Sequence, residues 1–308
     1  MNCCETKKIL SGFKNFEIGD KALIDSYTKP WELDCSDLSF ANMFIWGADG
    51  KMQYTIDEDV LYVKLEFKGF PVFLWPPIPN KEKEFDYKAL IERAFDYLES
   101  RGEKPQIRNI WLPFKKMIEN VMPEAEFTPS EDSWDYVYSR EKLAHLKGKK
   151  LHGKRNHINK FLQEHPDYVY KRIEPSMREE CLSVYDEWKE EKNLSENAFR
   201  NERRSVVMAL EHMQELGLVG GAILIDGKIK AFTMGERIRS DVQLIHIEKA
   251  DADINGLFPM INQQYVLNEC TEVEFINREE DMGVEGMRKA KRSYHPDYMV
   301  EKYWITKK

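Results

Sequence analysis

The sequence predicts an α/β protein with mixed α+β sheets, divided into two domains that share one order of elements. Its 308 residues exceed the usual length of a single domain, which favours two. A hairpin, a strand, a helix, a strand, a helix and a strand are predicted once in each half. The composition, 42% hydrophobic and 32% charged, is typical of a globular protein. We expect one domain over residues 1–145 and a second, with the candidate site, over residues 146–308.

The first half opens its predicted sheet with a hairpin. Apolar residues predict strands over 53–57 and 60–67, on both sides of an acidic turn, and a third strand over 71–75. A proline-rich stretch ends the third strand, and four apolar residues at helical spacing predict a helix over 87–101. The remaining predicted elements are a strand, a short helix and a strand, over residues 107–111, 114–120 and 134–138.

The second half repeats this order after two additional helices. Asp226-Gly227-Lys228 is a typical hairpin turn between predicted strands over 218–225 and 229–238. The elements predicted after this hairpin are a strand, a helix, a strand, a helix and a strand, over residues 243–249, 256–270, 273–276, 284–292 and 298–305. This order matches the core of the Gcn5-related N-acetyltransferase (GNAT) fold, so we expect two tandem acetyltransferase-like domains.

Two charged segments are the strongest candidates for a site. Residues 277–296 contain a block of carboxylates, then two glycines, then a block of four cations over 288–292, and a closing Tyr-His-Pro. A helix stopped by Pro296 explains that charge order, but a polar cluster directly after a predicted strand is typical of a functional site. Residues 145–172 contain eight Lys and Arg residues against two acidic ones. The net charge of −8 disfavours nonspecific nucleic-acid binding by the whole protein and leaves this one basic patch.

Four segments together carry a resemblance to a known family, and the last of them is the most specific. They are 31–46, 148–156 (GKKLHGKRN) with Phe161, 221–236, and 279–296 (EEDMGVEGMRKAKRSYHP). The chain resembles stand-alone members of the family named for the carboxy-terminal domain of bacterial phosphatidylglycerol lysyltransferase. The resemblance implies a tandem acetyltransferase-like fold and transfer of an acyl or aminoacyl group to an amine or hydroxyl. It does not extend to a membrane-embedded domain, so a lipid acceptor is not implied.

Acyl transfer to an amine needs a base, donors for the developing oxyanion and an acid for the leaving group. Glu248 lies at the end of the predicted strand 243–249, where such folds often hold a base or an acceptor-binding group. Tyr294 follows the block of four cations and corresponds to a tyrosine that acts as the acid in many acetyltransferases. The structural alternatives are a surface glutamate and a half-buried tyrosine with an ordinary hydrogen bond.

Donor-binding and acceptor-binding candidates come from the same two charged segments. Guanidinium and ammonium groups suit phosphate, so the predicted donor-binding residues are Lys149, Lys154, Arg155, Asn156, Arg288 and Lys291. The predicted acceptor-binding residues are Asn277, Glu279 and Asp281. The alternatives are a solvated basic helix over 150–162 and an internal network of salt bridges within 277–296.

The identity of the acyl donor is predicted from the absence of a phosphate-binding turn and from the size of the basic patch. Ordinary acetyltransferases bind the pyrophosphate of acyl-CoA on a glycine-rich basic turn, whereas this chain has an acidic turn over 250–256. Asp251 and Asp253 would repel phosphate or cap the following helix themselves. We prefer acyl-CoA as co-substrate, because one compact basic patch fits a small phosphorylated ligand better than a long tRNA footprint. Aminoacyl-tRNA is the second candidate donor, and a non-catalytic ligand-binding protein of the same fold is the third reading.

Other classes of site find little support in the sequence. Cys35, Cys181 and Cys270 are isolated, and the histidines match no zinc spacing, so we expect no metal and no tightly bound cofactor. No G-x-S-x-G elbow or catalytic cysteine signature is present, which favours direct transfer over a covalent intermediate. The amino terminus has no apolar signal core, and no segment is long and apolar enough to span a membrane, so we expect a cytoplasmic protein.

Overall fold

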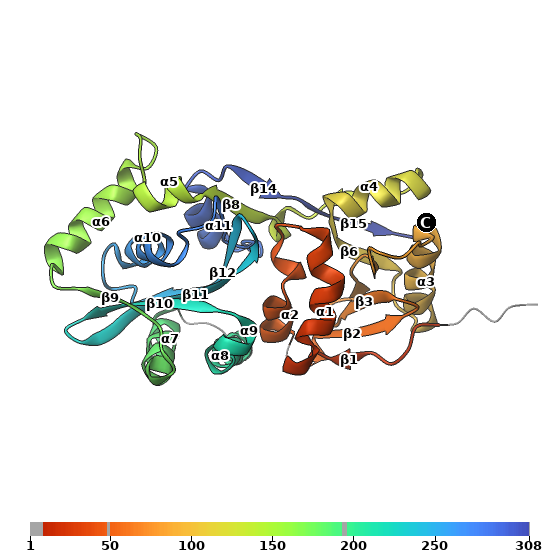
Figure 1. The fold of residues 1–308 in the computed structure, drawn as a ribbon, viewed down its shortest axis with the longest axis horizontal. Helices are drawn as coiled ribbons and strands as arrows, with labels where there is room; N and C mark the ends of the chain where they lie inside the picture. The colour runs from red at the N-terminus through yellow and green to blue at the C-terminus, as the bar shows by residue number, and fades with distance from the viewer. Residues whose placement is uncertain (1–8, 48–49, 193–195, 308) are drawn as a thin grey trace, which may run out of the picture. The chain divides into compact units, whose positions relative to one another are not determined.

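The computed structural model describes residues 9–47, 50–192 and 196–307, which form two compact units (Figure 1). The first unit consists of the described residues within Met1–Glu32, Gly47–Ser133 and Glu301–Lys308. The second unit consists of those within Leu33–Trp46 and Trp134–Val300. The division therefore does not fall at residue 145, because the strand predicted over 134–138 pairs inside the second unit.

The first unit is built on one mixed sheet in the order β1-β2-β3-β4-β6-β15-β7, with β5 paired to β3. Its strands are β1 (Lys14–Asn15), β2 (Met52–Asp57), β3 (Val60–Leu65), β4 (Phe73–Leu74), β5 (Ile78–Pro79), β6 (Gln106–Trp111), β7 (Thr128–Pro129) and β15 (Lys302–Thr306). Its helices are α1 (Lys21–Thr28), α3 (Tyr87–Ser100) and α4 (Leu112–Val121). Trp75 and Trp111 meet edge to face in the core of this unit, with ring centroids 5.7 Å apart.

The second unit is built on a sheet in the order β14-β8-β13-β12-β11-β10-β9. Its strands are β8 (Asp135–Ser139), β9 (Val169–Arg172), β10 (Val219–Ile225), β11 (Lys228–Arg239), β12 (Val242–Ala250), β13 (Phe275–Asn277) and β14 (Tyr298–Val300). Its helices are α2 (Phe40–Trp46), α5 (Arg140–His145), α6 (His152–Glu164), α7 (Arg178–Lys192), α8 (Glu196–Glu211), α9 (Met213–Leu216), α10 (Leu257–Glu269) and α11 (Glu285–Arg292). All neighbouring strands of this sheet are antiparallel except β12 and β13.

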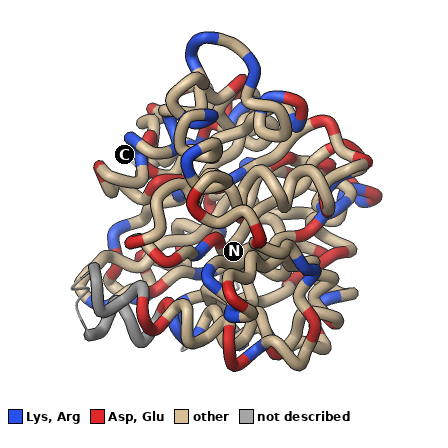
Figure 2. Tube along the Cα trace, turned by 90° about the vertical axis from the view of Figure 1, so that its left-hand side faces the viewer, with Lys and Arg blue, Asp and Glu red and all other residues tan. Residues whose placement is uncertain are grey.

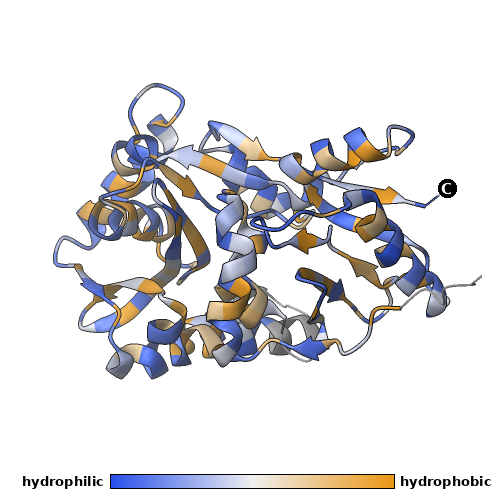
Figure 3. Cartoon of the chain, turned by 45° about the vertical axis from the view of Figure 1, so that its right-hand side comes forward, coloured by the Kyte–Doolittle hydropathy of each residue, from blue (hydrophilic) through white to orange (hydrophobic). Residues whose placement is uncertain are grey.

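Helices cover both faces of the sheet in the second unit. In Figure 1, α10 lies on one face of β10, β11 and β12, and α7 lies on the other. Figure 3 shows hydrophobic and hydrophilic residues interspersed along the helices, and α10 buries Leu257, Met260, Ile261, Asn262, Tyr265 and Val266. The core under α10 and α6 includes the buried residues Phe161, Tyr265, Met260 and Ile276.

The mixed α/β architecture predicted from the sequence is confirmed, and most predicted elements agree with the structure to within a few residues. The strand predicted over 298–305 is wrong as a single element. It consists of β14, which pairs with β8 in the second unit, and β15, which pairs with β6 in the first. The chain changes sheets at Glu301, which separates the two strands.

Candidate functional site

The second unit contains a place where two neighbouring parallel strands separate. β12 pairs with β13 only through Val242, Gln243 and Leu244, and then continues alone on that side to Ala250. The chain after β13 turns towards β8 instead, where Arg278 N donates to Tyr136 O over 2.9 Å. Side chains from the second half of β12 therefore face residues 278–281 without a backbone ladder between them. We call this place the strand split.

A β-bulge sets the direction of the side chains at the strand split. Between β11 and β12, Met234 pairs with Ile247 and Gly235 pairs with Ile245, so His246 is the extra residue. A Cβ atom on Gly235 would lie 1.9 Å from the carbonyl oxygen of Leu244, a distance that no side chain tolerates. Glycine is thus required opposite the bulge.

His246 occupies the first position of the strand split. Its side chain is fully buried, its Nδ1 lies 2.8 Å from Oε1 of Glu279, and its Nε2 lies 3.2 Å from Oε1 of Glu236. Ser39 donates to Glu236, and Asn42 donates to Glu279 over 3.1 Å. Burial lowers the pKa of His246, but the hydrogen bonds to the two carboxylates outweigh it and raise the pKa to about 9. At neutral pH this histidine is an imidazolium held between two carboxylates.

Glu248 and Arg278 occupy the second position of the strand split. Nη2 of Arg278 donates to Oε1 of Glu248 over 2.8 Å, and Asn262 of α10 donates to Oε2 over 2.8 Å. The pair is almost completely buried, with side-chain exposures of 14% for Glu248 and 11% for Arg278. Nη1 of Arg278 is buried and has no hydrogen-bond acceptor among the described residues. A buried guanidinium N–H that lacks an acceptor in good geometry is costly in a folded protein, and here the Tyr294 side chain is the nearest polar neighbour of the guanidinium besides Glu248.

Tyr294 and Lys154 complete this group of residues. The guanidinium carbon of Arg278 lies 4.9 Å from the centre of the Tyr294 ring, and Nζ of Lys154 lies 4.2 Å from the same centre. Burial raises the pKa of Tyr294 to about 12, so its hydroxyl keeps its proton at neutral pH. Burial, together with the nearby charge of Arg278, lowers the pKa of Lys154 to about 8. We call Glu248, Arg278, Tyr294 and Lys154 the Arg278 cluster.

The other predicted residues of the segment 277–296 are engaged within the fold. Asn277 donates to the carbonyl oxygen of Asp34 over 2.6 Å and to Oδ2 of Asp135 over 3.0 Å. Asp281 is buried, and Arg288 grips it through two hydrogen bonds of 2.8 Å. These contacts of Asn277 and Asp281 form an internal polar network, which was the structural alternative to acceptor binding for the segment 277–296.

Lys291 is also engaged in hydrogen bonds within the fold, and hydrogen bonds shift the pKa of Asp281. Nζ of Lys291 donates to the carbonyl oxygens of Arg278, over 2.6 Å, of Glu279, over 3.1 Å, and of Glu280. Burial raises the pKa of Asp281, but hydrogen bonds from Arg288, Tyr136 and the backbone outweigh it and lower the pKa to about 2. These contacts fix the chain that forms one side of the strand split.

Only one of the four predicted donor-binding residues before and in α6 reaches the Arg278 cluster. That residue is Lys154. Arg155 donates to the carbonyl oxygens of Gly148, over 2.7 Å, and Leu146, and so binds the loop before its own helix. Asn156 lies 3.2 Å from the ring nitrogen of His152 one turn earlier, and Lys149 is exposed.

The amino terminus of α10 differs from a typical phosphate-binding helix start. Gly256 adopts a φ of +82° directly before the helix, and a Cβ atom there would lie 2.2 Å from the carbonyl oxygen of His157. Asp251 does not cap the helix as we expected, because it accepts from the backbone of Asp253 and pairs with Lys230 at 2.9 Å. Pro259, in the first turn, has no N–H to offer.

Sequence reasoning missed five residues that the structure brings to the strand split. They are Ser39, Asn42, Glu236, His246 and Arg278. Arg278 follows Asn277 directly, and His246 precedes Glu248 by two residues, so both share a strand face or turn with a predicted residue. Ser39 lies 197 residues from Glu236 and Asn42 lies 237 residues from Glu279, and no local pattern indicates these contacts.

Across 9–47, 50–192 and 196–307, no group of three or more His, Cys, Asp or Glu side chains is arranged to hold a metal ion. Within the same ranges, no helix is both long enough and apolar enough to cross a membrane.

Comparison with solved structures supports the fold. A conserved protein of unknown function from Bacteroides thetaiotaomicron is 34% identical, covers 97% of this chain and 100% of its own, and superposes with a TM-score of 0.86. The C-terminal domain of a putative lysylphosphatidylglycerol synthetase from Agrobacterium fabrum is 14% identical, with coverages of 95% and 93% and a TM-score of 0.63. A tandem GNAT protein from the clavulanic acid biosynthesis pathway is 11% identical, with coverages of 96% and 98% and a TM-score of 0.52.

These similarities confirm the tandem acetyltransferase-like fold that we predicted from the order of elements. The resemblance stated from the sequence is confirmed as well, because the profile of one protein family matches nearly the whole chain, over residues 30–306. The chain belongs to the family described as "Phosphatidylglycerol lysyltransferase, C-terminal".

Proposed function

We propose that the protein is an acyltransferase in which an amine or hydroxyl acceptor directly attacks an activated acyl donor at the Arg278 cluster. The observation that carries this proposal is the buried Nη1 of Arg278, which makes no hydrogen bond of good geometry with any described residue, although Glu248 and Tyr294 both contact the same guanidinium. An N–H group held in this way suits the oxyanion that develops when an acyl carbonyl is attacked.

The proposed reaction assigns one step to each residue. The acceptor nitrogen forms a bond to the acyl carbon, and Glu248 takes the proton that the nitrogen loses. Nη1 of Arg278 stabilises the oxyanion of the tetrahedral intermediate. The bond from the acyl carbon to the leaving oxygen or sulfur then breaks, and Tyr294 donates its proton to that atom. Proton return from Glu248 to Tyr294 restores the starting state.

Lys154 has an electrostatic role in this proposal. Its ammonium group lies over the face of the Tyr294 ring, so its charge stabilises negative charge that develops on the phenol oxygen during proton donation. Because burial lowers the pKa of Lys154 to about 8, that charge is present at neutral pH and disappears above it.

An aminoacyl ester of tRNA is the donor that we favour. The lysyltransferases of this family take their acyl group from aminoacyl-tRNA, and this chain shares their profile. At the amino terminus of α10, where acetyltransferases bind the CoA pyrophosphate, the carbonyl oxygen of His157 packs closely against Gly256, and Pro259 lacks an N–H donor. Both observations count against the acyl-CoA that we preferred from the sequence.

Acyl-CoA is the second candidate donor. The net charge of −8 and the compact basic patch fit a small phosphorylated ligand. Binding measured at several salt concentrations separates the two donors, because a tRNA footprint gives a steep dependence on salt and CoA a shallow one.

The test is a transfer assay with purified protein, charged tRNA or acyl-CoA, and a panel of amines and hydroxyl compounds. Arg278→Lys and Tyr294→Phe are expected to lower kcat about 100-fold or more, because each removes a group that acts in the transition state. Glu92→Gln, an exposed substitution in α3 of the other unit, serves as the control. If the wild-type protein transfers an acyl group and Arg278→Lys and Tyr294→Phe do so at the same rate, the chemistry does not take place at this cluster. If the wild type binds a donor but transfers nothing to any acceptor, a binding function without chemistry takes the place of the proposal.

A further inference from the structure

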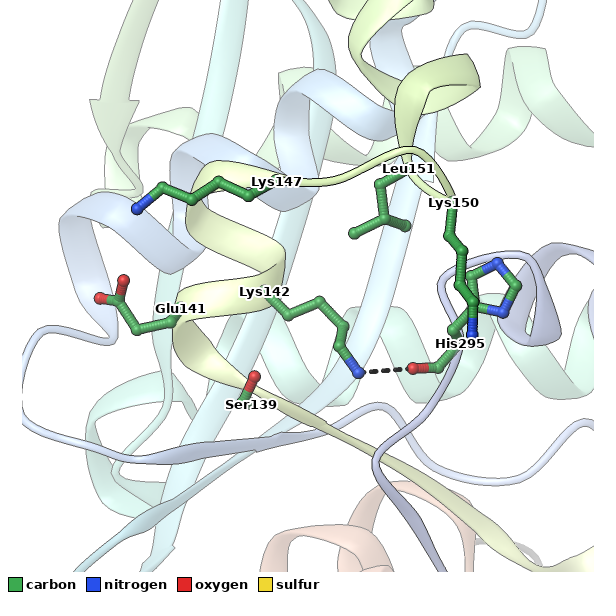
Figure 4. Close-up of a pocket in the computed structure, with 7 residues that line it drawn as sticks. All are labelled: Ser139, Glu141, Lys142, Lys147, Lys150, Leu151 and His295. Atoms are coloured by element: carbon green, nitrogen blue, oxygen red, sulfur yellow. Dashed lines mark hydrogen bonds between the residues drawn. The ribbon is translucent and has the colours of Figure 1, made fainter.

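A cavity of about 490 Å³ opens in the second unit, and His295, one of its lining residues, directly follows Tyr294 of the Arg278 cluster (Figure 4). Its walls come from the start of α5, the loop that joins α5 to α6, and the residue after Tyr294. The lining residues are Ser139, Glu141, Lys142, Lys147, Lys150, Leu151 and His295. The volume lies within the range of small-molecule sites and exceeds what a bare phosphate ion needs.

Two lysines at the cavity are free to meet a ligand. Lys142 is engaged, because its Nζ lies 2.7 Å from the carbonyl oxygen of His295 and 2.7 Å from Asp297. Lys147 and Lys150 are exposed, and no hydrogen bond or ion pair engages their side chains in the described part of the chain. Figure 2 shows their loop at the top of the molecule in that view, marked by several blue positions.

Glu141, the acidic residue that lines the cavity, has a cationic partner outside the cavity lining. Glu141 pairs with Arg140 at 3.3 Å and lies 3.5 Å from His145. The field inside the cavity is therefore set by the lysines, and an anion is the ligand class that fits it.

The loop that carries the two lysines is held in one conformation. Arg155, in the first turn of α6, donates hydrogen bonds to the carbonyl oxygens of Leu146 and Gly148, the two residues on either side of Lys147 in the sequence. Leu151, at the end of the loop, is buried and gives the cavity one apolar wall. A loop fixed by such hydrogen bonds loses less conformational entropy on binding a ligand than a flexible loop does.

The cavity and the Arg278 cluster are neighbours along two segments of chain. His295 borders the cavity, and the residue before it is Tyr294, whose ring contacts Arg278 and Lys154. Consecutive Cα atoms are only about 3.8 Å apart, so the cavity wall at His295 is joined directly to the backbone of the Arg278 cluster at Tyr294.

We propose that this cavity binds a phosphate of the nucleotide that carries the acyl group. This inference rests on the proposed acyl transfer. In an aminoacylated RNA the phosphate of the terminal nucleotide is a few bonds from the acylated ribose hydroxyl, whereas in acyl-CoA a long pantetheine arm separates the thioester from the phosphates. The short separation between cavity and cluster fits the RNA 3′ end. Lys147 and Lys150 hold the phosphate, and Leu151 contacts the sugar.

The test compares two double variants that remove the same charge. Lys147→Ala/Lys150→Ala empties the cavity of its free cations, and Lys171→Ala/Lys228→Ala removes two exposed lysines of the same unit elsewhere. The probes are a fluorescent RNA hairpin ending in CCA, CoA and inorganic phosphate, each titrated at several salt concentrations. The cavity variant is expected to bind the hairpin roughly tenfold more weakly or worse, with a salt slope lower by about 1, while the control variant binds as the wild type does.

The probes also distinguish the source of the phosphate. If CoA binding alone depends on the two cavity lysines, the phosphate belongs to CoA and the cavity still serves the donor. Equal affinities of the two double variants for every probe, or no binding of any probe by the wild type, overturn the cavity proposal. The transfer assay is read separately: activity with equal affinities leaves the proposed function standing, and lysine-dependent binding without any transfer removes the proposed function alone.

Discussion

Nδ1 of His246 lies 2.8 Å from Oε1 of Glu279, and this contact joins β12 to the chain after β13 where the two strands have ceased to pair. On its other side the same imidazole meets Glu236 at 3.2 Å. Ser39 and Asn42 complete the hydrogen bonds of the two carboxylates. Every charge in this network has a partner inside the protein, so its role is to hold the strand split in shape rather than to bind a substrate.

The stability of the protein should fall as the pH rises from about 6.5 to 9. Folding raises the pKa of His246 to about 9, whereas an unfolded histidine titrates near 6.5. The stabilisation is therefore complete below pH 6.5 and disappears as the pH rises through the folded pKa. Linkage gives a loss of about 3 kcal/mol for this group, which urea unfolding at a series of pH values would detect.

The matched variant for that experiment is His246→Gln, whose amide remains neutral across the range. The difference in unfolding free energy between wild type and variant is expected to shrink steadily between pH 6.5 and 9. A constant difference over that range would show that the imidazole does not change its charge there, and the assignment of an imidazolium would be wrong.

Asp281 should be important for stability rather than for acceptor binding. It is buried and accepts hydrogen bonds from Tyr136, Gly283 N and Arg288. Asp281→Asn is expected to cost about 2–4 kcal/mol, because it leaves the guanidinium without its carboxylate. Thermal unfolding checks this, with Glu285→Gln on the exposed side of α11 as a control expected to change little. An Asp281→Asn protein as stable as the control would return Asp281 to the candidates for acceptor binding.

The sequence predicted the fold well because periodicity and turn residues are local signals. Asp226-Gly227 marks the hairpin between β10 and β11, and apolar residues at helical spacing mark α3. The division into units was harder to predict. β8 pairs with β13 and β14, and β15 returns to β6, so strand partners are chosen by packing far along the chain and not by sequence order.

The candidate site was predicted in part, for a related reason. Glu248 and Tyr294 were predicted and lie in one cluster, but the group that connects them is Arg278. Within 277–296 the charges have no local pattern that separates a residue facing the strand split from one paired internally. Arg288 and Lys291 looked equally available in the sequence, and only their contacts with Asp281 and three carbonyl oxygens show them to be engaged.

The pH dependence of transfer should report the charge of Lys154. The proposed role needs the ammonium form, and burial lowers the pKa of Lys154 to about 8. We therefore expect kcat/KM of the wild type to fall as the pH rises through about 8. Lys154→Arg keeps its charge over this range and should remove that fall, even if its rate at neutral pH is lower. Initial rates from pH 6.5 to 9.5 test this.

The opposite profile would change the mechanism. If activity rises through pH 8 in the wild type and the rise is lost in Lys154→Met, the neutral amine acts as the base, and the assignment of that role to Glu248 is wrong. Thermal unfolding of both Lys154 variants at pH 7 shows whether a change in rate reflects a change in folding.

Gly235→Ala should disrupt the strand split through β11, the strand that pairs with β12 on the side away from β13. A Cβ atom at residue 235 would lie 1.9 Å from the carbonyl oxygen of Leu244, so β11 and β12 must move apart or lose the bulge at His246. We expect a loss of more than about 2 kcal/mol in unfolding free energy, because the added methyl group meets backbone atoms of Leu244 and Ile245 and not a side chain that could move. The control is Gly153→Ala in α6, where no neighbouring atom lies within 4 Å of the added methyl and alanine favours the helix. Urea unfolding compares the two variants, and near-equal stabilities would mean that the bulge relaxes easily and does not fix the direction of His246.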